Sequence, residues 1–311
     1  MADKLRFAVI GVGYLGRFHA LIYSRLPDVE LVGVVDTDPE RARAVAEEAG
    51  CAVFDSLEVI ADQVDAVSVV VPTTAHLAVA EPLLRRGIHM LLEKPIAATR
   101  EEGKRIVDLA DQGGAILQIG HLERFNAGVM ALAEHIDHPR FVEIQRLGEF
   151  VERATDVDVV SDLMIHDIDI ILSLMGSELQ SVSAVGTPVL TNCVDIANAR
   201  LEFANGAVAN VVASRVSDRK TRRIRVFQEH KYLSLDFIEQ TIDIAYPHLA
   251  PGATRPEIVR ERIQVVPVKP LDREIEAFVA CVREHRRPLV DGRVGLEALD
   301  VALKVRDCMG H

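Results

Sequence analysis

Residues 5–16 read Leu-Arg-Phe-Ala-Val-Ile-Gly-Val-Gly-Tyr-Leu-Gly, and this stretch decides the fold of the first part of the chain. The apolar run Leu5 to Ile10 predicts a buried strand, which Gly11, Gly13 and Gly16 follow directly. Glycines at this spacing permit a tight turn, and they let the backbone approach a pyrophosphate at the N-terminus of the next helix. The stretch therefore predicts the strand–turn–helix unit of a dinucleotide-binding domain.

A carboxylate at the end of the next apolar run specifies the cofactor. Asp36 lies 20 residues beyond Gly16, where it can accept hydrogen bonds from a ribose diol and repels a 2′-phosphate. We therefore expect NAD, with NADP less favoured because Arg41 and Arg43 follow closely. Tyr14 and Leu15, inside the glycine motif, are also expected to contact the cofactor. A tight turn beside a surface aspartate is the alternative, which the strand, helix and carboxylate context argues against.

Apolar runs alternate with helical stretches through about residue 120, as in a parallel sheet buried on both faces. Asp38-Pro39 and Thr99 to Glu102 predict helix starts, and Gly87 and Gly113 predict helix stops. We expect an N-terminal Rossmann domain over residues 1–121, built on a doubly wound parallel sheet. The expected strands are 5–10, 30–35, 66–71, 88–92 and 115–119.

The pattern changes after Gly120, where strand signals follow one another without helices between them. Asn205-Gly206 predicts a hairpin, because this pair suits a turn with positive φ. We expect a second, α+β domain over residues 122–311, with a large, mostly antiparallel open sheet and a last helix that can pack back on the first domain. Its other expected elements are a strand over 141–147, a helix over 159–175 ended by Gly176, and closing helices near 271–285 and 294–308.

Composition excludes several classes of protein. The chain has 311 residues, enough for two domains, and its formal net charge of −12 disfavours a nucleic-acid partner. No apolar run reaches the ~20 residues of a membrane span, and the charged start does not resemble a signal peptide. The four cysteines are scattered without a Cys-x-x-Cys pair, as in reduced thiols of a cytoplasmic protein, and no metal site is expected.

The expected helix over 159–175 carries polar residues on an otherwise aliphatic surface. Asp162, His166 and Asp169 are spaced i, i+4, i+7 and therefore share one helix face. Buried carboxylate and imidazole groups need partners or a ligand, so this stripe is a candidate catalytic site. Judged from these three residues alone, the alternative is a structural role, with a hydrogen-bonded core histidine and two paired aspartates. Asp169 in particular can hold the helix in place.

Glu93-Lys94-Pro95 comes at the end of the fourth expected strand. Ligands of open α/β sheets lie at the carboxyl ends of the strands, so the Lys94 ammonium is expected to point toward the cofactor. Pro95 fixes the local turn and is able to take a cis peptide bond. Taken alone, this motif is better explained by a solvated surface lysine.

Glu93-Lys94-Pro95 together with Asp162-x-x-x-His166-Asp167-x-Asp169 resembles the glucose–fructose oxidoreductase, inositol dehydrogenase and rhizopine-catabolism (Gfo/Idh/MocA) family, over essentially the whole chain. The resemblance implies nicotinamide-dependent oxidation of a sugar or cyclitol hydroxyl, with Lys94 and His166 as the catalytic pair and Asp162 beside them. It also implies a homodimer or homotetramer assembled through the open sheet. The residues it places along the cofactor are Pro72, Thr73 and His76 in the loop 71–76, with Glu93 and Lys94.

Residues 120–126, Gly-His-Leu-Glu-Arg-Phe-Asn, resemble one branch of that family, the nucleotide-sugar 3-dehydrogenases. This branch implies a UDP-N-acetylglucosamine-type substrate oxidised at its 3-hydroxyl. His121 and Arg124 follow the last expected Rossmann strand and are expected to line the substrate cleft. Arg215 and Arg219 flank an expected loop and are candidates to bind a diphosphate, with a solvated loop as the equal alternative.

Oxidation of a secondary alcohol moves a hydride to the nicotinamide and a proton to a base. An imidazole ordinarily has a pKa near ~6.5, which suits His166 to that exchange, while Lys94 can stabilise negative charge on the same oxygen. Asp162 can orient the imidazole or bind a neighbouring hydroxyl. Which of Lys94 and His166 is the formal base stays open. The alternatives are a dehydrogenase of a free monosaccharide or cyclitol, and a non-catalytic NAD-binding regulator, which would have no need of the pair.

Overall fold

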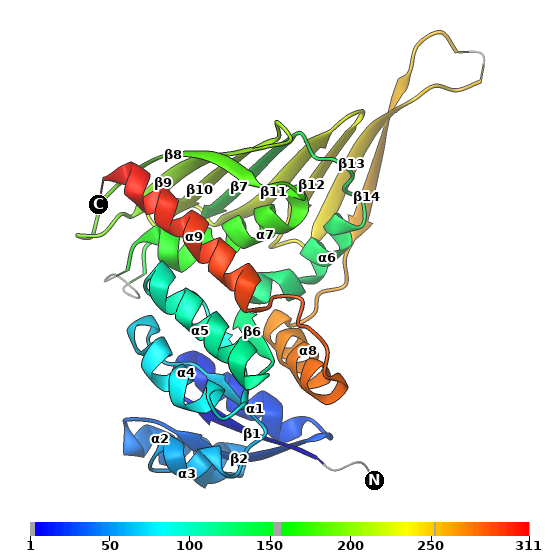
Figure 1. Cartoon of the computed structure of the whole chain (residues 1–311). Coiled ribbons are helices and arrows are strands. Elements are labelled where there is room, and N and C mark those ends of the chain that lie inside the picture. Colours follow the sequence, from blue (N-terminus) through cyan, green and yellow to red (C-terminus); the bar gives the residue numbers. More distant parts are fainter. Residues whose placement is uncertain (1–3, 152–156, 252, 311) are drawn as a thin grey trace. The chain divides into compact units, whose positions relative to one another are not determined.

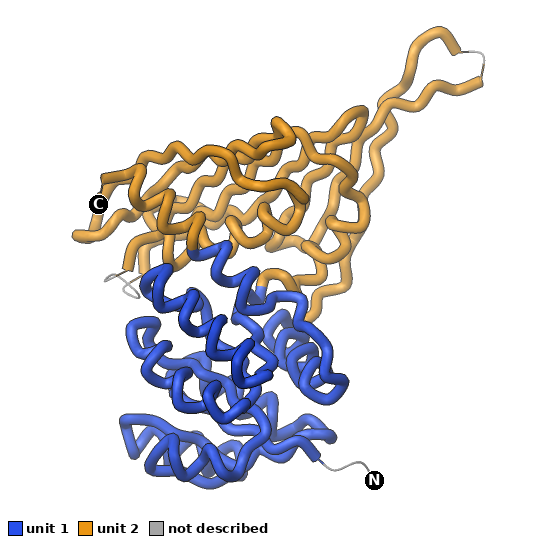
Figure 2. The backbone as a smooth tube through the Cα atoms, in the orientation of Figure 1, with its two compact units in different colours: residues 1–122, 269–299 blue, residues 123–268, 300–311 orange. Residues whose placement is uncertain are grey.

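The computed structural model describes residues 4–151, 157–251 and 253–310. The chain divides into two compact units, which Figure 2 shows in different colours. Unit 1 comprises residues 1–122 and 269–299, and unit 2 comprises residues 123–268 and 300–311. Each unit is built around its own sheet. None of the described helices combines the length and the apolar character that crossing a membrane requires.

Unit 1 contains a six-stranded sheet in the order β3-β2-β1-β4-β5-β6, with all neighbouring strands parallel. This arrangement confirms the expected doubly wound Rossmann sheet. The short strand β3 was not expected, because two exposed residues give no apolar run. The strands are β1 (Leu5–Ile10), β2 (Val29–Val35), β3 (Ala52–Val53), β4 (Ala66–Val69), β5 (His89–Glu93) and β6 (Leu117–Gly120).

The helices of unit 1 begin largely where their capping residues predict. The Asp38 side chain accepts from the backbone N–H groups of Glu40 and Arg41, and the Thr99 hydroxyl accepts from that of Glu102. The predicted stop at Gly113 is one residue early, since Gly114 takes the left-handed conformation, with φ +65°. The helices are α1 (Tyr14–Arg25), α2 (Pro39–Ala49), α3 (Leu57–Ala61), α4 (His76–Leu84), α5 (Arg100–Gly113) and α8 (Pro270–Glu284), with residues 292–299 of α9 (Gly292–Met309).

Helix α8 packs into the core of unit 1 although it is far from β1 in the sequence (Figure 1). The Phe7 ring lies 4.7 Å from that of Tyr23 and 5.9 Å from that of Phe278, centroid to centroid. We assigned this helix to the second expected domain because the change in strand pattern set that boundary, and such a pattern does not reveal long-range packing. The functional extent of the two domains stays a prediction.

Unit 2 contains an eight-stranded sheet in the order β14-β13-β12-β11-β7-β10-β9-β8. Neighbouring strands are antiparallel except β7 and β10, which confirms the mostly antiparallel sheet. Gly206, with φ +78°, forms the expected hairpin turn. The strands are β7 (Phe141–Leu147), β8 (Leu179–Thr187), β9 (Ile196–Phe203), β10 (Val208–Ser214), β11 (Thr221–Gln228), β12 (Lys231–Asp236), β13 (Thr241–His248) and β14 (Glu257–Gln264).

Two helices of unit 2 pack on one face of this sheet (Figure 1). Helix α6 (Ala127–Ala133) contacts β12 and β13, and helix α7 (Ile165–Met175) contacts β7 and β10. Alternate strand residues such as Ile144, Val211 and Ile224 are buried beneath the helices, as the two-residue period of a strand requires. The same alternation places Phe141 and Phe227 on the opposite face, which we call the open face.

Candidate active site

The glycine turn after β1 has the shape that a dinucleotide needs. Gly11 has φ +83°, and a Cβ on Gly11 or Gly16 would collide with backbone carbonyl oxygens of Val70 or Gly11. An added Cβ on Gly13 would instead meet nothing within 4 Å, so space is open above the start of α1. Gly13 is the N-cap, and no side chain of the described residues caps the helix there. This turn therefore fits the pyrophosphate of NAD.

Asp36 follows β2 and is held as an anion beside that turn. Its carboxylate accepts from the backbone N–H groups of Val12 (2.7 Å) and Asp38 (2.9 Å), and from the Arg41 guanidinium (2.8 and 3.2 Å). Burial alone would raise the pKa of Asp36, but Arg41 and the backbone donors outweigh it and lower that pKa. A carboxylate has about four acceptor positions, so a ribose diol would have to replace Arg41 there. Arg41 is half exposed and able to withdraw.

Lys94 is placed directly after β5, and the Glu93 side chain beside it is buried. The Lys94–Pro95 peptide bond is cis. Glu93 Oε2 accepts from the backbone N–H of Lys94 at 3.3 Å, while Oε1 lies 3.3 Å from Nε2 of His19. A Cβ on Gly120 would come within 2.9–3.0 Å of the Glu93 carboxyl group, so Gly120 makes room for it. Contact of Glu93 with the cofactor stays a prediction, and in this structure its carboxylate supports the Lys94 backbone.

His76, which is predicted to lie along the cofactor, is buried between two loops. The ring is 1% exposed, with Nδ1 3.2 Å from the carbonyl oxygen of Ile96 and Nε2 3.1 Å from that of Val71. Burial lowers the pKa of His76 and outweighs these two acceptors. The ring thus lies between the loop after β4 and the segment after Pro95, and in its neutral form it donates to one of the two carbonyl oxygens. Pro72 is exposed and Thr73 is half-buried, so both remain candidates to contact the cofactor.

The predicted catalytic helix in unit 2 begins with a π-helical turn, Val160–Met164, which α7 continues. The Asp158 carboxylate accepts from the backbone N–H groups of Val160 and Ser161, both at 2.9 Å. Asp162 is half-buried in the π turn, and His166 is buried in the first turn of α7. Because a π turn bonds i to i+5, the regular i, i+4 spacing that we predicted for these two residues is interrupted. Such turns are frequent at functional sites.

Buried ion pairs fix α7 on the sheet of unit 2. The Arg146 guanidinium donates to both oxygens of Asp167 (2.7–3.0 Å) and to Glu123 (2.9 Å). Burial disfavours the charged guanidinium, but these two carboxylates outweigh it and raise the pKa of Arg146. Arg124 pairs with Asp169 at 3.3 Å. This pair fits the alternative in which Asp169 holds the helix, and the role of Arg124 at the substrate cleft stays a prediction.

Two other predicted substrate residues are also buried. His121 is fully buried directly after β6. Arg215 is 6% exposed; its guanidinium donates to the carbonyl oxygens of Val157 and Val194, and lies 3.5 Å from Asp195. Diphosphate binding by Arg215 stays a prediction, and in this structure its guanidinium faces backbone carbonyl oxygens and Asp195. Arg219 is exposed and remains a candidate.

Asp195 explains why Arg215 points inward. Its carboxylate accepts from the backbone N–H groups of Val189, Leu190 and Thr191 at 2.6–2.8 Å. Burial would raise the pKa of Asp195, but these donors lower it to about 2. A buried anion needs a cation nearby, and Arg215 is that cation. The loop before β9 is therefore held by a charge pair that no local sequence pattern indicates.

Two residues of interest were not assigned from the sequence. Arg222 pairs in register with Arg146, and its guanidinium lies 3.9 Å from Glu123. Arg222 lies two residues before the buried Ile224, and this spacing indicates that it lies on the helix side of the sheet. His19 is fully buried on the core side of α1, three residues beyond Gly16.

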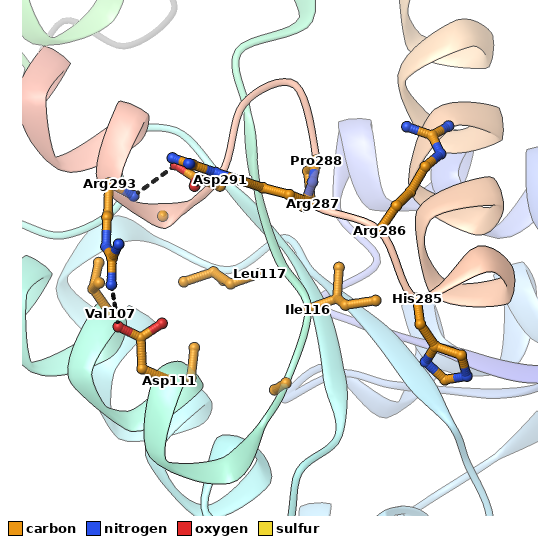
Figure 3. A pocket seen from close by; sticks show the side chains of 13 residues that line it. Val107, Asp111, Ile116, Leu117, His285, Arg286, Arg287, Pro288, Asp291 and Arg293 are labelled. Carbon is orange, nitrogen blue, oxygen red and sulfur yellow. Dashed lines mark hydrogen bonds and ion pairs between the residues drawn. The ribbon is translucent and has the colours of Figure 1, made fainter.

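One pocket in unit 1 is separate from these residues. It has a volume of about 260 Å³ and lies between α5, β6 and the connection from α8 to α9 (Figure 3). Arg293 and Asp111, which line it, pair at 2.7 Å, and Arg287 pairs with Asp291. None of the predicted site residues lines this pocket. No group of three possible metal ligands occurs within the described part of the chain.

The glycine turn, the carboxylate that follows β2 and the strand-end lysine together fit a dinucleotide-binding oxidoreductase of the Rossmann class. Residues 5–121 match the family model described as "Oxidoreductase family, NAD-binding Rossmann fold", and residues 129–234 match the "GFO/IDH/MocA C-terminal domain". The chain belongs to the Gfo/Idh/MocA family, as the sequence motifs predicted. It is an oxidoreductase, and its cofactor is NAD.

Relatives cover nearly the whole chain. The chain is 39% identical over 303 residues, 97% of its length and 96% of the relative's, to a UDP-N-acetylglucosamine 3-dehydrogenase of Acidithiobacillus ferrooxidans. A solved structure of that enzyme superposes with a TM-score of 0.92 at 38% identity, covering 98% of each chain. An inositol 2-dehydrogenase of Rhizobium meliloti is 28% identical over 96% of this chain and 94% of its own.

Proposed function

We propose that this protein oxidises the 3-hydroxyl of UDP-N-acetylglucosamine, or of a closely related nucleotide-activated N-acetyl amino sugar, with NAD. The observation that carries the proposal is the 39% identity, over 97% of the chain, to an enzyme named for that reaction. The inositol dehydrogenase is similar over a comparable length but at 28% identity, and it supports the second candidate, oxidation of a free cyclitol or monosaccharide.

Lys94 and His166 are the proposed acid–base pair. Bound NAD supplies the acceptor for the hydride of the carbinol carbon. The imidazole of His166 takes the hydroxyl proton, and the Lys94 ammonium stabilises the negative charge on the same oxygen. Asp162 orients the imidazole or binds a neighbouring hydroxyl. Their convergence on one substrate oxygen stays a prediction, since Lys94 belongs to unit 1 and His166 to unit 2.

Arg219 and Arg222 are the proposed cations for the substrate diphosphate. Arg219 is exposed in the loop before β11, and Arg222 is half-buried on the helix side of that strand. Burial lowers the pKa of Arg222, and the neighbouring Arg146 lowers it further. An anionic diphosphate beside Arg222 would relieve that repulsion through charge-assisted hydrogen bonds. The net charge of −12 makes such local cations more necessary, because the overall field repels an anion.

A panel of substrates tests the proposal. The purified protein is mixed with NAD and, separately, with UDP-N-acetylglucosamine, N-acetylglucosamine, glucose and myo-inositol, while NADH formation is followed by absorbance. We expect reduction of NAD with the nucleotide sugar, and a product whose C3 is a carbonyl group by NMR. Free N-acetylglucosamine lacks the diphosphate and therefore tests whether the enzyme needs that group. Reduction with inositol or glucose, and none with the nucleotide sugar, would establish the second candidate instead.

We also propose a homo-oligomer, a dimer or tetramer, that forms in the cytoplasm through the open face of the unit 2 sheet. Three half-buried aromatic rings from neighbouring strands gather on that face: Phe227 lies 5.6 Å from Phe141 and 5.1 Å from Tyr232, between ring centroids. Val185 on the same face is 68% exposed. A second copy would remove this apolar area from water. The four free cysteines support a reducing compartment.

A further inference from the structure

Helix α7 of unit 2 carries two buried acidic residues beside His166. Asp167 is fully buried and Asp169 is 1% exposed, whereas the other buried residues of the helix, apart from His166, are isoleucines and Met175. A regular helix turns by about 100° per residue, so Asp167 lies about 100° to one side of His166 and Asp169 about 60° to the other. The direction in which the His166 side chain leaves the helix therefore falls between those of the two carboxylates.

Arg146 of β7 holds Asp167 through hydrogen bonds that run in one direction, since a guanidinium only donates. Its Nε donates to both oxygens of Asp167 at 3.0 Å, and Nη2 donates to Oδ1 at 2.7 Å. Nη1 donates to Oε1 of Glu123 at 2.9 Å, and Oε2 of Glu123 accepts from the Asn126 amide at 3.1 Å. The three charged side chains are no more than 7% exposed. They form a buried network that bonds α7 to the sheet.

Asp169, on the other side of His166, is bonded to a different element. Arg124, in the turn at residues 122–125, donates from Nη1 to Oδ1 of Asp169 at 3.3 Å. The two carboxylates that flank His166 therefore have separate donors, Arg146 on the sheet and Arg124 in the turn. Two contacts at different angles around one helix axis restrict rotation of the helix about that axis.

A buried network of this kind is a poor source of stability. Charged groups lose their hydration on burial, and apolar side chains of similar volume are often equally or more stabilising. Burial raises the pKa of Asp167, and the contacts with Arg146 offset only part of that effect. Directional bonds nevertheless select one orientation, whereas aliphatic side chains packed on an aliphatic sheet face tolerate several arrangements of similar stability. The network is therefore suited to fix the orientation of α7.

We propose that Arg146 is a positioning residue: through Asp167 it fixes the rotation of α7 about its axis, and thereby the direction of the His166 imidazole. The catalytic part of this inference rests on the proposed function and its role for His166, whereas the orientation of the side chain does not. Arg146 contacts neither substrate nor cofactor in this scheme. Its role differs from that of Arg222, the proposed diphosphate ligand, which lies 3.9 Å from the same Glu123 carboxylate.

An apolar replacement of the network separates orientation from stability, without cofactor or substrate. Arg146→Met, Asp167→Leu and Glu123→Gln are combined in one triple variant, so that no charged member of the network stays buried alone. We expect its Tm to equal or exceed the wild-type Tm. The imidazole NMR signals of His166, assigned in histidine-labelled protein by their loss in His166→Gln, should form one set in the wild type. In the triple variant they should broaden or split, because α7 then takes several orientations.

Two controls show that the effect belongs to α7. In the triple variant, the signals of His135 and His230, elsewhere in unit 2, should stay single. Arg262→Met combined with Asp243→Leu removes an exposed Arg–Asp pair of β13 and β14, whose atoms lie 2.6 Å apart, and should leave the His166 signals at their wild-type positions.

Steady-state kinetics with the nucleotide sugar test the catalytic part. In the triple variant we expect kcat to fall between about ten- and a hundredfold, since misplacement of a reacting group has an effect of that size. NADH affinity should stay at the wild-type value, because the glycine turn belongs to unit 1. Glu123→Gln alone is the reference, because it changes the neighbour of Arg222 without removing the bonds between Arg146 and Asp167. It should lower kcat less than the triple variant does.

The outcomes separate the two claims. A single sharp set of His166 signals in the triple variant, or a kcat equal to that of Glu123→Gln, overturns the positioning role. Split signals in the variant, with no turnover of any sugar by the unmodified protein, support the positioning role and overturn the proposed function. If the triple variant does not fold, Arg146→Lys must split the same signals, because an ammonium cannot reproduce the planar contact of a guanidinium with both oxygens. A single set in Arg146→Lys then overturns the inference.

Discussion

Lys94 and His166 are tested most directly as single residues. Lys94→Ala and His166→Ala should each lower turnover about 10²-fold or more, because general acid–base assistance contributes on that scale. NADH affinity, measured by calorimetric titration, should remain near the wild-type value, since neither change alters the glycine turn. Matched controls are Lys104→Ala and His138→Ala, whose side chains are 67% and 95% exposed. Near-normal turnover in either active-site variant would reject that residue's role.

Asp36 is the residue that we expect to determine the cofactor preference. Asp36→Ser removes the anion that accepts from the ribose and repels a 2′-phosphate, while keeping a hydroxyl near the backbone donors. We expect NADH affinity to fall about tenfold or more, the loss of a charge-assisted hydrogen bond, and the ratio of NADPH to NADH affinity to rise. Arg41→Ala should leave NADH binding equal or tighter, because the guanidinium occupies that carboxylate. An unchanged NADPH to NADH ratio in Asp36→Ser would contradict the assignment.

At the scale of elements, the sequence predicted what depends on local pattern. Five strands of the parallel sheet, the capped helices and the Gly206 hairpin follow from apolar runs and turn residues, with one or two residues of difference at several ends. The inward turn of Arg215 and the packing of α8 depend on partners distant in sequence, and local pattern does not contain them. The π turn at Val160–Met164 likewise could not be predicted, because no apolar periodicity distinguishes it from an ordinary α-helix.

The same limit explains the candidate site. The glycines, Asp36 and Lys94 could be predicted as site residues because dinucleotide binding requires a fixed spacing along the chain. The resemblance places His76 along the cofactor, and the sequence does not reveal that its ring nitrogens lie near carbonyl oxygens of two different loops. His19 escaped notice because a buried histidine among apolar helix residues resembles an ordinary core position. Only the neighbouring strands reveal what its two nitrogens contact.

The link that His76 makes between two loops predicts a pH dependence of stability. Its pKa is lowered in the folded protein by burial, so below about pH 6.5 the unfolded chain binds a proton that the folded chain resists. Stability should therefore be fully present above that pH and fall as the pH decreases toward the folded pKa. His89, whose pKa burial also lowers, adds to the same slope.

Thermal unfolding between about pH 7.5 and about pH 5.5 measures that slope. At the higher pH, the Tm of His76→Asn should be below the wild-type Tm, because a buried contact is lost. On acidification, the Tm of His76→Asn should fall less than the wild-type Tm does. His138→Asn, at a fully exposed position, serves as the control and should keep the wild-type slope. An identical slope in His76→Asn and wild type would show that His76 is not responsible.

At the scale of the whole molecule, the open face of unit 2 has a composition that suits contact with a copy of itself. Phe227 stands near the middle of the sheet, between Phe141 and Tyr232, and Arg225 on the same strand pairs with Glu143 on the same face. An apolar centre with paired charges around it resembles the core and rim of a protein interface. An isologous contact would double every interaction, because each copy presents the same patch.

Phe227→Asp tests that assembly. The side chain lies on the face away from α6 and α7, so an aspartate there is compatible with the folded unit but places an unpaired charge in the proposed interface. We expect light scattering after size exclusion to show a dimer or tetramer for the wild type and a smaller species for Phe227→Asp, with circular dichroism unchanged. Val59→Asp, at an exposed apolar position of α3, is the control and should keep the wild-type mass. A monomeric wild type would contradict the proposed assembly. A Phe227→Asp protein with the wild-type mass would show that the contact lies elsewhere.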